Sequence, residues 1–379
     1  MRGNKLFKFI DAYFGKSLLF IFGKLFRQKI QLASMRYQPD RILLIKLSAM
    51  GDTILMIPAI RNLRQAYPKA SIKMIVTRVN SEVLADCPYL DGLILLDLER
   101  LVKKPWLSWS FIKLLRREYF DLAIDFDQWL RISPLLAFLS GAEQRVGFQT
   151  PGQHRDQTYT KRVMHDPDKH EVECFLDLLR VLEVPITDKD PELWVPRSIT
   201  VKVNKTLADW GAEKGEIVIG LHPGCGSHGF PRQWPEQNYL DLIKRLQEEH
   251  QVMIVLTGGL QEEGLVTRIA AKLEVKPALA VGWDLAETIA LVKKFKVLVC
   301  GNTGVMHIAA AVKTPVVALH GPTDPRKWGP WGEKHTVLTA KSSCSPCLYL
   351  GFEYACHDYP CMATISVDEV YGAISNYLK

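Results

Sequence analysis

The feature that most limits the possible folds of this chain is the alternation of short apolar segments with segments of helical period. Two such runs occur, one beginning at residues 41–46 and the other at residues 217–222. Short apolar segments of this kind are typical of strands buried on both faces. Strands that alternate with helices form βαβ units, in which the strands are parallel and the helices cover both faces of the sheet. The sequence therefore predicts an α/β protein with two parallel sheets.

The predicted elements and domain boundaries follow from this pattern. In the first run we expect strands at 41–46, 72–76, 93–96 and 122–126, and helices at 53–67, 111–117 and 171–182. In the second run we expect strands at 217–222, 252–256, 297–299 and 315–319, helices at 236–249 and 284–294, and two further helices that end at Leu273 and Ala311. Pro58 should kink or tighten the first turns of helix 53–67. A chain of 379 residues can form two domains. We expect an N-terminal extension at 1–40 and Rossmann-like domains at 41–190 and 191–365. The second domain would include a Cys-rich loop at 341–362, and a terminal helix would follow at 366–379.

The positive charge of the chain is concentrated at its N-terminus. Residues 1–36 contain eight basic side chains and one acid, a net charge of +7 that equals the formal charge of the whole chain. The remainder is formally neutral, and nothing in it indicates a nucleic-acid-binding face. Residues 5–26 predict a basic amphipathic helix, which could lie in the interface of an anionic membrane or pack on the body of the protein. No apolar run is long enough to predict a membrane-spanning helix, and the apolar patch 18–22 lacks the small-residue cleavage site of a signal peptide.

The last predicted βαβ unit of the second run has a first loop suited to an anion. Gly301 and Gly304 allow the backbone to approach a ligand, and Thr303 is a favourable N-cap for the next helix. The first N–H groups of that helix would face the loop, as they do in phosphate sites. His307 lies on the same helical face, and the loop 320–325 leaves the carboxyl end of the next strand, where open α/β sheets bind ligands. An ordinary turn with a cap, and a histidine without a ligand, would produce the same pattern.

Three charged residues are candidates for catalysis or binding. Asp52 follows the first predicted strand and could be a general base that takes a proton from an acceptor hydroxyl, or simply the N-cap of the next helix. Arg232 follows the glycine-rich loop 223–227 and could offset the charge of a leaving diphosphate. Arg131 could reach an anionic acceptor, although both arginines could also be solvated surface residues. Neither the dinucleotide fingerprint nor the P-loop pattern occurs, which argues against a dehydrogenase and an NTPase.

Four of the eight cysteines cluster with the spacing C-x2-C-x8-C-x4-C. Cys344 and Cys347 are a plausible half of a tetrahedral zinc site, whereas Cys356 and Cys361 are spaced more widely than in common zinc ribbons. Structural zinc, reduced thiols and disulfides therefore all remain open. The other cysteines are scattered, which is typical of buried reduced thiols in a cytosolic protein.

Five motifs, in order, resemble those of the heptosyltransferase-type glycosyltransferases of family 9. They are KLSAMGDTI at 46–54 with PAI at 58–60, HPGCGS at 222–227 with RQWP at 232–235, TGG at 257–259 with Glu262, NTGVMH at 302–307 and GPTDP at 321–325. The resemblance extends from about residue 41 to the C-terminus. It implies a GT-B architecture, in which two Rossmann-like domains face each other across a cleft. It also implies transfer with inversion from a nucleotide-activated sugar, without a cofactor or a catalytic metal.

The resemblance assigns roles to individual residues. The N-terminal domain would bind the acceptor, with Asp52 as the base and with Ser48, Met50 and Gly51 on the acceptor side. Arg131 is added to the acceptor side because of its position after strand 122–126, and no family motif supports it. Arg232 stands where the family usually has a phosphate-binding lysine, and an arginine can still make a bidentate phosphate contact. The C-terminal domain would bind the donor through Gly224, Ser227, Glu262 at the nucleoside, Asn302, Thr303, Gly304 and His307.

One departure affects the expected donor. Relatives that act on ADP-heptose often carry Asp where this chain has Asn302, and Asn lacks the charge although it still donates and accepts hydrogen bonds. We expect transfer of a heptose from ADP-heptose to a lipopolysaccharide core acceptor, by a cytoplasmic enzyme held on the inner face of the cytoplasmic membrane through its N-terminal helix. The alternatives are a transferase for another nucleotide sugar, a sugar-nucleotide epimerase or hydrolase, and a non-catalytic nucleotide-sugar-binding protein.

Overall fold

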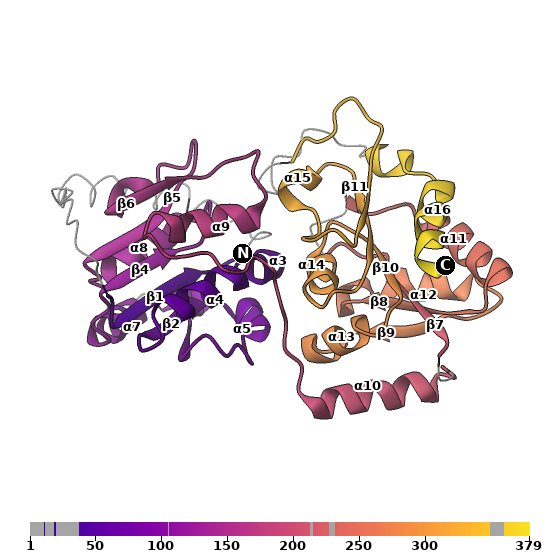
Figure 1. The fold of residues 1–379 in the computed structure, drawn as a ribbon, viewed down its shortest axis with the longest axis horizontal. Helices are drawn as coiled ribbons and strands as arrows, with labels where there is room; N and C mark the ends of the chain where they lie inside the picture. Colours follow the sequence, from indigo (N-terminus) through magenta and orange to yellow (C-terminus); the bar gives the residue numbers. More distant parts are fainter. Residues whose placement is uncertain are drawn as a thin grey trace. The chain divides into compact units, whose positions relative to one another are not determined.

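The computed structural model describes Asp11, Leu19 and residues 38–104, 106–212, 215–226, 232–348 and 360–379. Apart from Asp11 and Leu19, the predicted N-terminal helix 5–26 lies outside this part of the chain. The chain forms two compact units, Met1–Lys189 and Asp190–Lys379 (Figure 1). Among the described residues, no helix combines the length and the apolar character needed to cross a membrane.

The N-terminal unit is built on a six-stranded parallel sheet with the strand order β3-β2-β1-β4-β5-β6. Its strands are β1 (Arg41–Lys46), β2 (Ser71–Val76), β3 (Gly92–Leu95), β4 (Leu122–Asp125), β5 (Gln144–Gln149) and β6 (Lys161–Met164). Its helices are α3 (Met50–Leu55), α4 (Ile57–Ala66), α5 (Arg78–Val83), α6 (Leu98–Lys103), α7 (Leu107–Arg117), α8 (Ile132–Leu139) and α9 (Glu171–Arg180). Helix α4 packs against α9, and α7 packs against α8.

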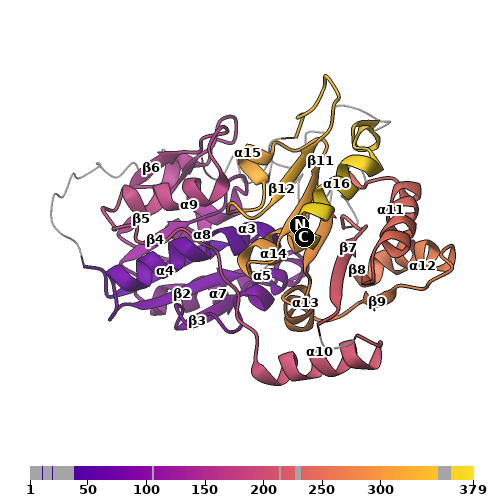
Figure 2. The ribbon, with the colours of Figure 1, turned by 45° about the vertical axis from the view of Figure 1, so that its right-hand side comes forward.

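The C-terminal unit repeats this plan with the strand order β12-β11-β10-β7-β8-β9. Its strands are β7 (Ile217–His222), β8 (Val252–Gly258), β9 (Ala278–Val281), β10 (Val297–Gly301), β11 (Val316–His320) and β12 (Thr336–Thr339). Its helices are α10 (Arg197–Asp209), α11 (Glu236–Glu249), α12 (Glu263–Ala271), α13 (Leu285–Val292), α14 (Gly304–Ala311), α15 (Pro325–Trp328) and α16 (Val367–Leu378). Figures 1 and 2 show helices on both faces of each sheet.

Both units have the doubly wound strand order, which determines where a ligand can bind. Read in chain order within each unit, both sheets have the order 3-2-1-4-5-6. The direction of winding reverses between β1 and β4 in the N-terminal unit and between β7 and β10 in the C-terminal unit. Ligands of open α/β sheets bind at the carboxyl ends of the strands at such a reversal. The loops after these four strands are therefore the expected ligand-binding loops.

The predicted fold class is confirmed, since two parallel sheets with covering helices are present. The bounds of β1, β7 and α11 agree with the prediction. The edge strands β6, β9 and β12 were not predicted. They are short and partly exposed, and their sequences therefore lack a continuous run of apolar residues. The predicted helix 53–67 is in fact two helices, α3 and α4, which meet at Met56. Pro58 lies in the first turn of α4, where its missing N–H has no helical partner to lose.

Strand β1 anchors the centre of the N-terminal sheet and thereby positions the residues that follow it. Residues 42–45 are fully buried, and burial of a large aliphatic side chain contributes about 1.5–3 kcal/mol. The last residue of the strand, Lys46, is equally buried. In the C-terminal unit the terminal helix α16 packs against α11, and Ser366 forms the predicted cap, because its Oγ accepts a hydrogen bond from the Glu369 N–H at 3.3 Å.

Candidate active site

Asp52 lies in the first turn of α3, directly after the carboxyl end of β1. The N-cap of α3 is Ala49, so the alternative that Asp52 caps the helix is wrong. The Asp52 side chain is buried and accepts hydrogen bonds from Lys46 Nζ at 3.2 Å and from Gln128 Nε2 at 3.3 Å. Asp52 is therefore a buried carboxylate held by a cation and an amide at the point where the sheet order reverses.

Lys46 provides the buried cation of this group. Its Nζ lies 2.7 Å from Gln128 Oε1 and 3.6 Å from Asp127 Oδ1, in addition to the contact with Asp52. It also lies 5.5 Å from the centre of the Phe175 ring. A buried ammonium is tolerated only when it is paired and hydrogen-bonded. Lys46 meets this condition through groups that follow both β1 and β4.

Asp127 holds the loop that leads into α3. Its carboxylate accepts hydrogen bonds from the Leu47 N–H at 2.7 Å and from Ser48 Oγ at 3.0 Å. The next residue, Ala49, has a φ of 64° and a ψ of 122°, a sparsely populated conformation that costs an L-residue about 1–3 kcal/mol. Such strained residues are found where the surrounding structure enforces them, commonly at functional sites. Of the predicted acceptor residues, Ser48 thus points inward to Asp127, while Met50 is partly exposed next to Asp52.

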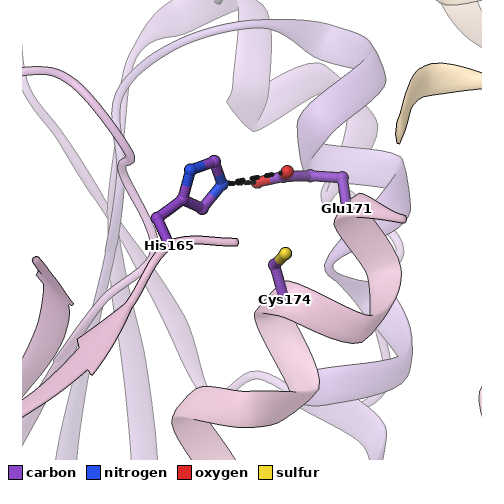
Figure 3. A group of neighbouring side chains, drawn as sticks. All are labelled: His165, Glu171 and Cys174. Carbon is purple, nitrogen blue, oxygen red and sulfur yellow. Dashed lines mark hydrogen bonds and ion pairs between the residues drawn. The ribbon is translucent and has the colours of Figure 1, made fainter. Parts of the chain in front are cut away.

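Glu171, in the first turn of α9, and His165, which directly follows β6, extend the group (Figure 3). Glu171 Oε1 accepts a hydrogen bond from Gln128 Nε2 at 2.6 Å, and both Glu171 oxygens lie 3.0–3.1 Å from His165 Nε2. Together with Cys174 these residues are the one group among the described residues whose donor atoms are close enough to bind a metal ion. All three are buried, the imidazole and carboxylate already contact each other, and the Cys174 thiol lies 3.5 Å from the Asp166 carbonyl. The contacts of Glu171 with His165 and Gln128 indicate that these residues hold the Gln128 side chain in place.

A second buried network lies behind Asp127. Asp125 accepts hydrogen bonds from Arg155 Nη2 at 2.7 Å and from the Tyr159 hydroxyl at 2.5 Å. Burial raises the pKa of Asp125 to about 6, while the Arg155 guanidinium opposes this rise. Arg155 Nη2 also donates to Ser133 Oγ at 2.8 Å. This network fixes the end of β4, from which Asp127 and Gln128 extend.

Arg131, a candidate for the acceptor site, is held by contacts within the N-terminal unit. Its Nε donates to the Gln153 carbonyl at 3.0 Å, and its Nη1 lies 3.6 Å from Asp11 Oδ2. The Arg131 backbone N–H also donates to Asp11 Oδ1 at 2.8 Å, and burial raises the pKa of Asp11. The guanidinium is thus engaged by a carbonyl and a carboxylate, which an anionic acceptor would have to displace.

In the C-terminal unit, Arg232 and Asn302 lie together at the carboxyl end of β10. Arg232 Nη1 donates to the Asn302 carbonyl at 2.9 Å, and Asn302 Nδ2 donates to the Trp328 carbonyl at 2.9 Å. A side chain at Gly301 would meet the Arg232 carbonyl oxygen at 2.9 Å, so glycine is required for this approach. The amide of Asn302 is matched to its surroundings, since an aspartate has no N–H to donate to Trp328.

Glu262 organises the glycine-rich loop. Its carboxylate accepts hydrogen bonds from the Gly226 N–H at 2.7 Å and from the Gly259 N–H at 2.8 Å. A Cβ atom at Gly224 would lie 2.0 Å from the Glu262 carboxylate carbon. His222 Nε2 lies 3.7 Å from the same carboxylate, and burial lowers the pKa of this histidine. Glu262 therefore holds the loops after β7 and β8 together.

Helix α14 begins at the predicted anion-binding loop. Thr303 is its N-cap, as predicted, but the side chain makes no capping hydrogen bond. The Thr303 hydroxyl oxygen is buried and, within the described part of the chain, has no hydrogen-bond partner. Gly304 is the first residue of the helix, and the buried His307 lies one turn further on. Buried polar atoms are normally satisfied, which makes this hydroxyl a candidate to bind a ligand.

Two predicted features fall partly outside the described residues. Ser227 and Cys356 are not described. Cys344 is exposed and Cys361 is buried, and the described cysteines of the cluster do not form a group with metal-ligand spacing. The zinc site stays a prediction.

Sequence reasoning missed the residues that surround Asp52. Lys46 lies in a family motif, but its position predicts only a buried strand, and Gln128 lies 82 residues further along the chain. A lysine at the end of an otherwise apolar strand was the available signal, because a buried lysine requires partners. Gln128, Glu171 and His165 carried no local signal.

Comparison with known proteins decides the family. The sequence profile of Glycosyltransferase family 9 (heptosyltransferase) matches residues 108–354. This chain belongs to glycosyltransferase family 9. The predicted family and the predicted enzyme class, a glycosyltransferase, are thus confirmed.

The alignments with curated relatives cover most of this family 9 chain and most of each relative. It is 26% identical over 319 residues to lipopolysaccharide heptosyltransferase 1 of Pseudomonas aeruginosa, an alignment that covers 81% of this chain and 86% of the relative. It is 29% identical over 292 residues to lipopolysaccharide heptosyltransferase 3 of Escherichia coli, with coverage of 75% and 83%.

Solved structures show the same fold. The family 9 glycosyl transferase from Veillonella parvula has a TM-score of 0.76 at 23% identity and covers 91% of this chain and 98% of its own. An Escherichia coli heptosyltransferase with ADP-2-deoxy-2-fluoro heptose has a TM-score of 0.66 at 22% identity and covers 89% and 99%. At these identities the structures establish the GT-B fold of the family 9 chain.

Proposed function

We propose that this family 9 enzyme transfers a heptose, with inversion, from ADP-heptose to a lipopolysaccharide core acceptor. The curated relatives, which carry the names of lipopolysaccharide heptosyltransferases, support the donor and acceptor classes. Family membership also favours a transferase over the alternatives of an epimerase, a hydrolase or a non-catalytic binding protein.

The proposed reaction uses one residue group from each unit. Asp52 takes the proton of the acceptor hydroxyl as its oxygen forms a bond to C1 of the sugar, and the bond between C1 and the ADP oxygen breaks on the opposite face. Arg232 and the first N–H groups of α14 stabilise the negative charge that develops on the departing diphosphate. No catalytic metal has a role in this scheme, and chelation by EDTA is expected to leave the transfer rate unchanged.

The observation that carries the proposal is the environment of Asp52. The carboxylate is buried in the first turn of α3 at the reversal of the sheet order, and Lys46 and Gln128 hold it although it caps no helix. A buried carboxylate without a capping role is suited to proton transfer when an acceptor hydroxyl comes within hydrogen-bond distance.

Replacement of the carboxylate tests this proposal. The change Asp52→Asn keeps the shape of the side chain but removes the base, so we expect the transfer rate to fall by about 100-fold or more. Calorimetric titration with ADP should give an unchanged Kd, because the proposed donor residues belong to the C-terminal unit. Mass spectrometry of truncated lipopolysaccharide cores measures transfer, and exposed Asp86→Asn is the matched control. A rate within threefold of the wild type would exclude Asp52 as the base.

The donor is tested by a scan of nucleotide sugars. Selective binding of ADP-heptose, with a mass gain of one heptose on the acceptor, is the expected result. Selectivity for another nucleotide sugar would keep the transferase and overturn the heptosyl assignment. It would also indicate that Asn302, which donates to the Trp328 carbonyl, selects a different sugar.

We further propose that the enzyme works as a peripheral protein on the inner face of the cytoplasmic membrane. The concentration of positive charge in residues 1–36 supports attraction to anionic lipid.

A further inference from the structure

The surface around α7 exposes aromatic and basic side chains together. We call the residues Trp106, Trp109, Lys113, Leu114, Arg116 and Arg117 the α7 face. The two tryptophans are 65% and 71% exposed, and Leu114 is 49% exposed. Lys113, Arg116 and Arg117 are exposed as well. Val102 and Tyr119, which precede and follow these residues in the chain, are also exposed.

The helical period gathers these side chains on one side. Trp106 is the N-cap of α7, and Trp109, Lys113 and Arg116 follow at intervals of three, four and three residues. Side chains at this spacing are neighbours on one helical face. In Figure 1, α7 lies at the lower left of the N-terminal unit.

Most of the α7 face lies away from the part of the helix that packs on the unit, although Arg116 Nε donates to the Leu139 carbonyl at 3.2 Å. Leu115 is the fully buried residue of α7. The core contact is therefore made by the opposite side, and burial in the unit does not account for the exposed tryptophans. Single exposed apolar residues are ordinary, but several together on one face mark an interaction surface.

The charge of the segment identifies the chemistry of the partner. Residues 98–119 contain six basic and two acidic side chains. One of the acids, Glu118, is already paired with Lys73 at 2.7 Å. The remaining charge is strongly positive, which is complementary to an anionic surface.

We propose that the α7 face docks this enzyme on an anionic lipid membrane. Tryptophans insert at the level of the headgroups, and lysine and arginine contact lipid phosphates while they stay hydrated. Exposed indoles next to several cations are the composition of segments that lie in the headgroup region of anionic membranes, and the net positive charge of the segment makes such a membrane the partner of complementary charge. The proposal adds a structured docking surface to the predicted N-terminal segment, and it stands whether or not the donor is ADP-heptose.

Vesicle binding by the full chain tests the proposal. Two variants are needed. The double variant combines Trp106→Ala and Trp109→Ala, and the triple variant combines Lys113→Gln, Arg116→Gln and Arg117→Gln. Co-sedimentation with phosphatidylcholine vesicles that contain phosphatidylglycerol should give partition coefficients at least about 10-fold below that of the wild type for both variants. The control, Val201→Ala with Lys205→Gln on exposed positions of α10, should stay within twofold. Vesicles of phosphatidylcholine alone should bind the wild type at least about 10-fold more weakly.

Unchanged partitioning of both α7 variants would overturn the proposal, because the N-terminal segment would then account for binding. If the α7 variants lose several degrees of melting temperature while their partitioning stays unchanged, another part of the chain covers the α7 face. That result would also overturn the proposal. Brominated lipids provide a second measurement, since they should quench the fluorescence of the wild type more than that of Trp106→Phe with Trp109→Phe. Transfer to a water-soluble truncated acceptor should be equal in all variants, so this result is independent of the test of Asp52.

Discussion

At the scale of single residues, the orientation of the Gln128 amide determines how Asp52 is held. Its Nε2 donates to Glu171 and Asp52, and its Oε1 accepts from Lys46. A flipped amide would place its oxygen against Glu171 and its NH2 group against the lysine ammonium. Both contacts would be unfavourable in a buried site. Glu171, supported by His165, is thus a positioning residue that acts through Gln128.

Removal of this amide should weaken catalysis without affecting the donor. We expect Gln128→Leu to lower kcat about 10-fold, because a hydrogen bond to a charged group contributes about 1.5–3 kcal/mol. The Kd for ADP, measured by calorimetry, should not change. Exposed Gln149→Leu serves as the matched control. If Glu171 acts through Gln128, then adding Glu171→Gln to Gln128→Leu should cause little further loss, whereas a multiplicative loss would contradict that role.

At the scale of secondary-structure elements, two N-caps of the C-terminal unit differ in what their hydroxyls do. Ser366 Oγ accepts a hydrogen bond from the backbone of α16, and Glu369 completes a capping box. Thr303 occupies the same position at α14, yet its buried hydroxyl makes no such bond. The first cap stabilises its helix, and the second leaves the helix start open to an anion.

The two caps should respond differently to substitution. Thr303→Val keeps the shape of the side chain and removes an unsatisfied hydroxyl, so the free energy of unfolding should stay the same or rise. The affinity for ADP should nevertheless fall about 10-fold. Ser366→Ala should lower the free energy of unfolding by about 1 kcal/mol and leave ADP affinity unchanged. Urea unfolding and calorimetry separate these outcomes, and loss of stability in Thr303→Val would identify an ordinary structural cap.

The glycine-rich loop leads to another prediction at this scale. In Gly224→Ala the new methyl group would meet the Glu262 carboxylate and displace the loop, so we expect weaker ADP binding by about 10-fold or more. Gly372→Ala in α16 is the control, because no heavy atom lies within 4 Å of its added Cβ. That change should stabilise the helix by about 0.5–1 kcal/mol. Equal ADP affinity in the two variants would show that the loop does not contact the donor.

At the scale of the whole molecule, a buried histidine connects stability to pH. His320 ends β11, and its Nδ1 lies 3.0 Å from Thr323 Oγ1. Burial lowers its pKa from 6.5 to about 4, with Asp324 opposing and Arg232 reinforcing this shift. The folded protein therefore binds fewer protons than the unfolded chain between these two values.

The contribution of His320 to stability should consequently fall as the pH decreases from about 6.5 to about 4, whereas Asp125, whose pKa burial raises to about 6, contributes in the opposite direction. The full difference is about 3 kcal/mol, at about 1.4 kcal/mol for each pH unit. His320→Asn keeps an acceptor near Thr323 but does not titrate, so the free energy of unfolding of the wild type should fall relative to that of the variant as the pH decreases through this range. Urea unfolding at several pH values measures both slopes, and parallel slopes for the two proteins would contradict a buried neutral His320.

The sequence by itself determined the features that depend on neighbouring residues. The alternation of strands and helices, the bounds of β1 and β7, the Thr303 and Ser366 caps and the family motifs are all local patterns, because periodicity and capping act within a few residues. The tertiary structure decided what surrounds each candidate. Lys46, Asp52, Gln128 and Glu171 come together only because β1 pairs with β4 and α9 packs against α3 and α4. Such contacts depend on strand order and packing, which join residues far apart in the chain, and they turned Asp52 from a possible helix cap into a buried carboxylate held for chemistry.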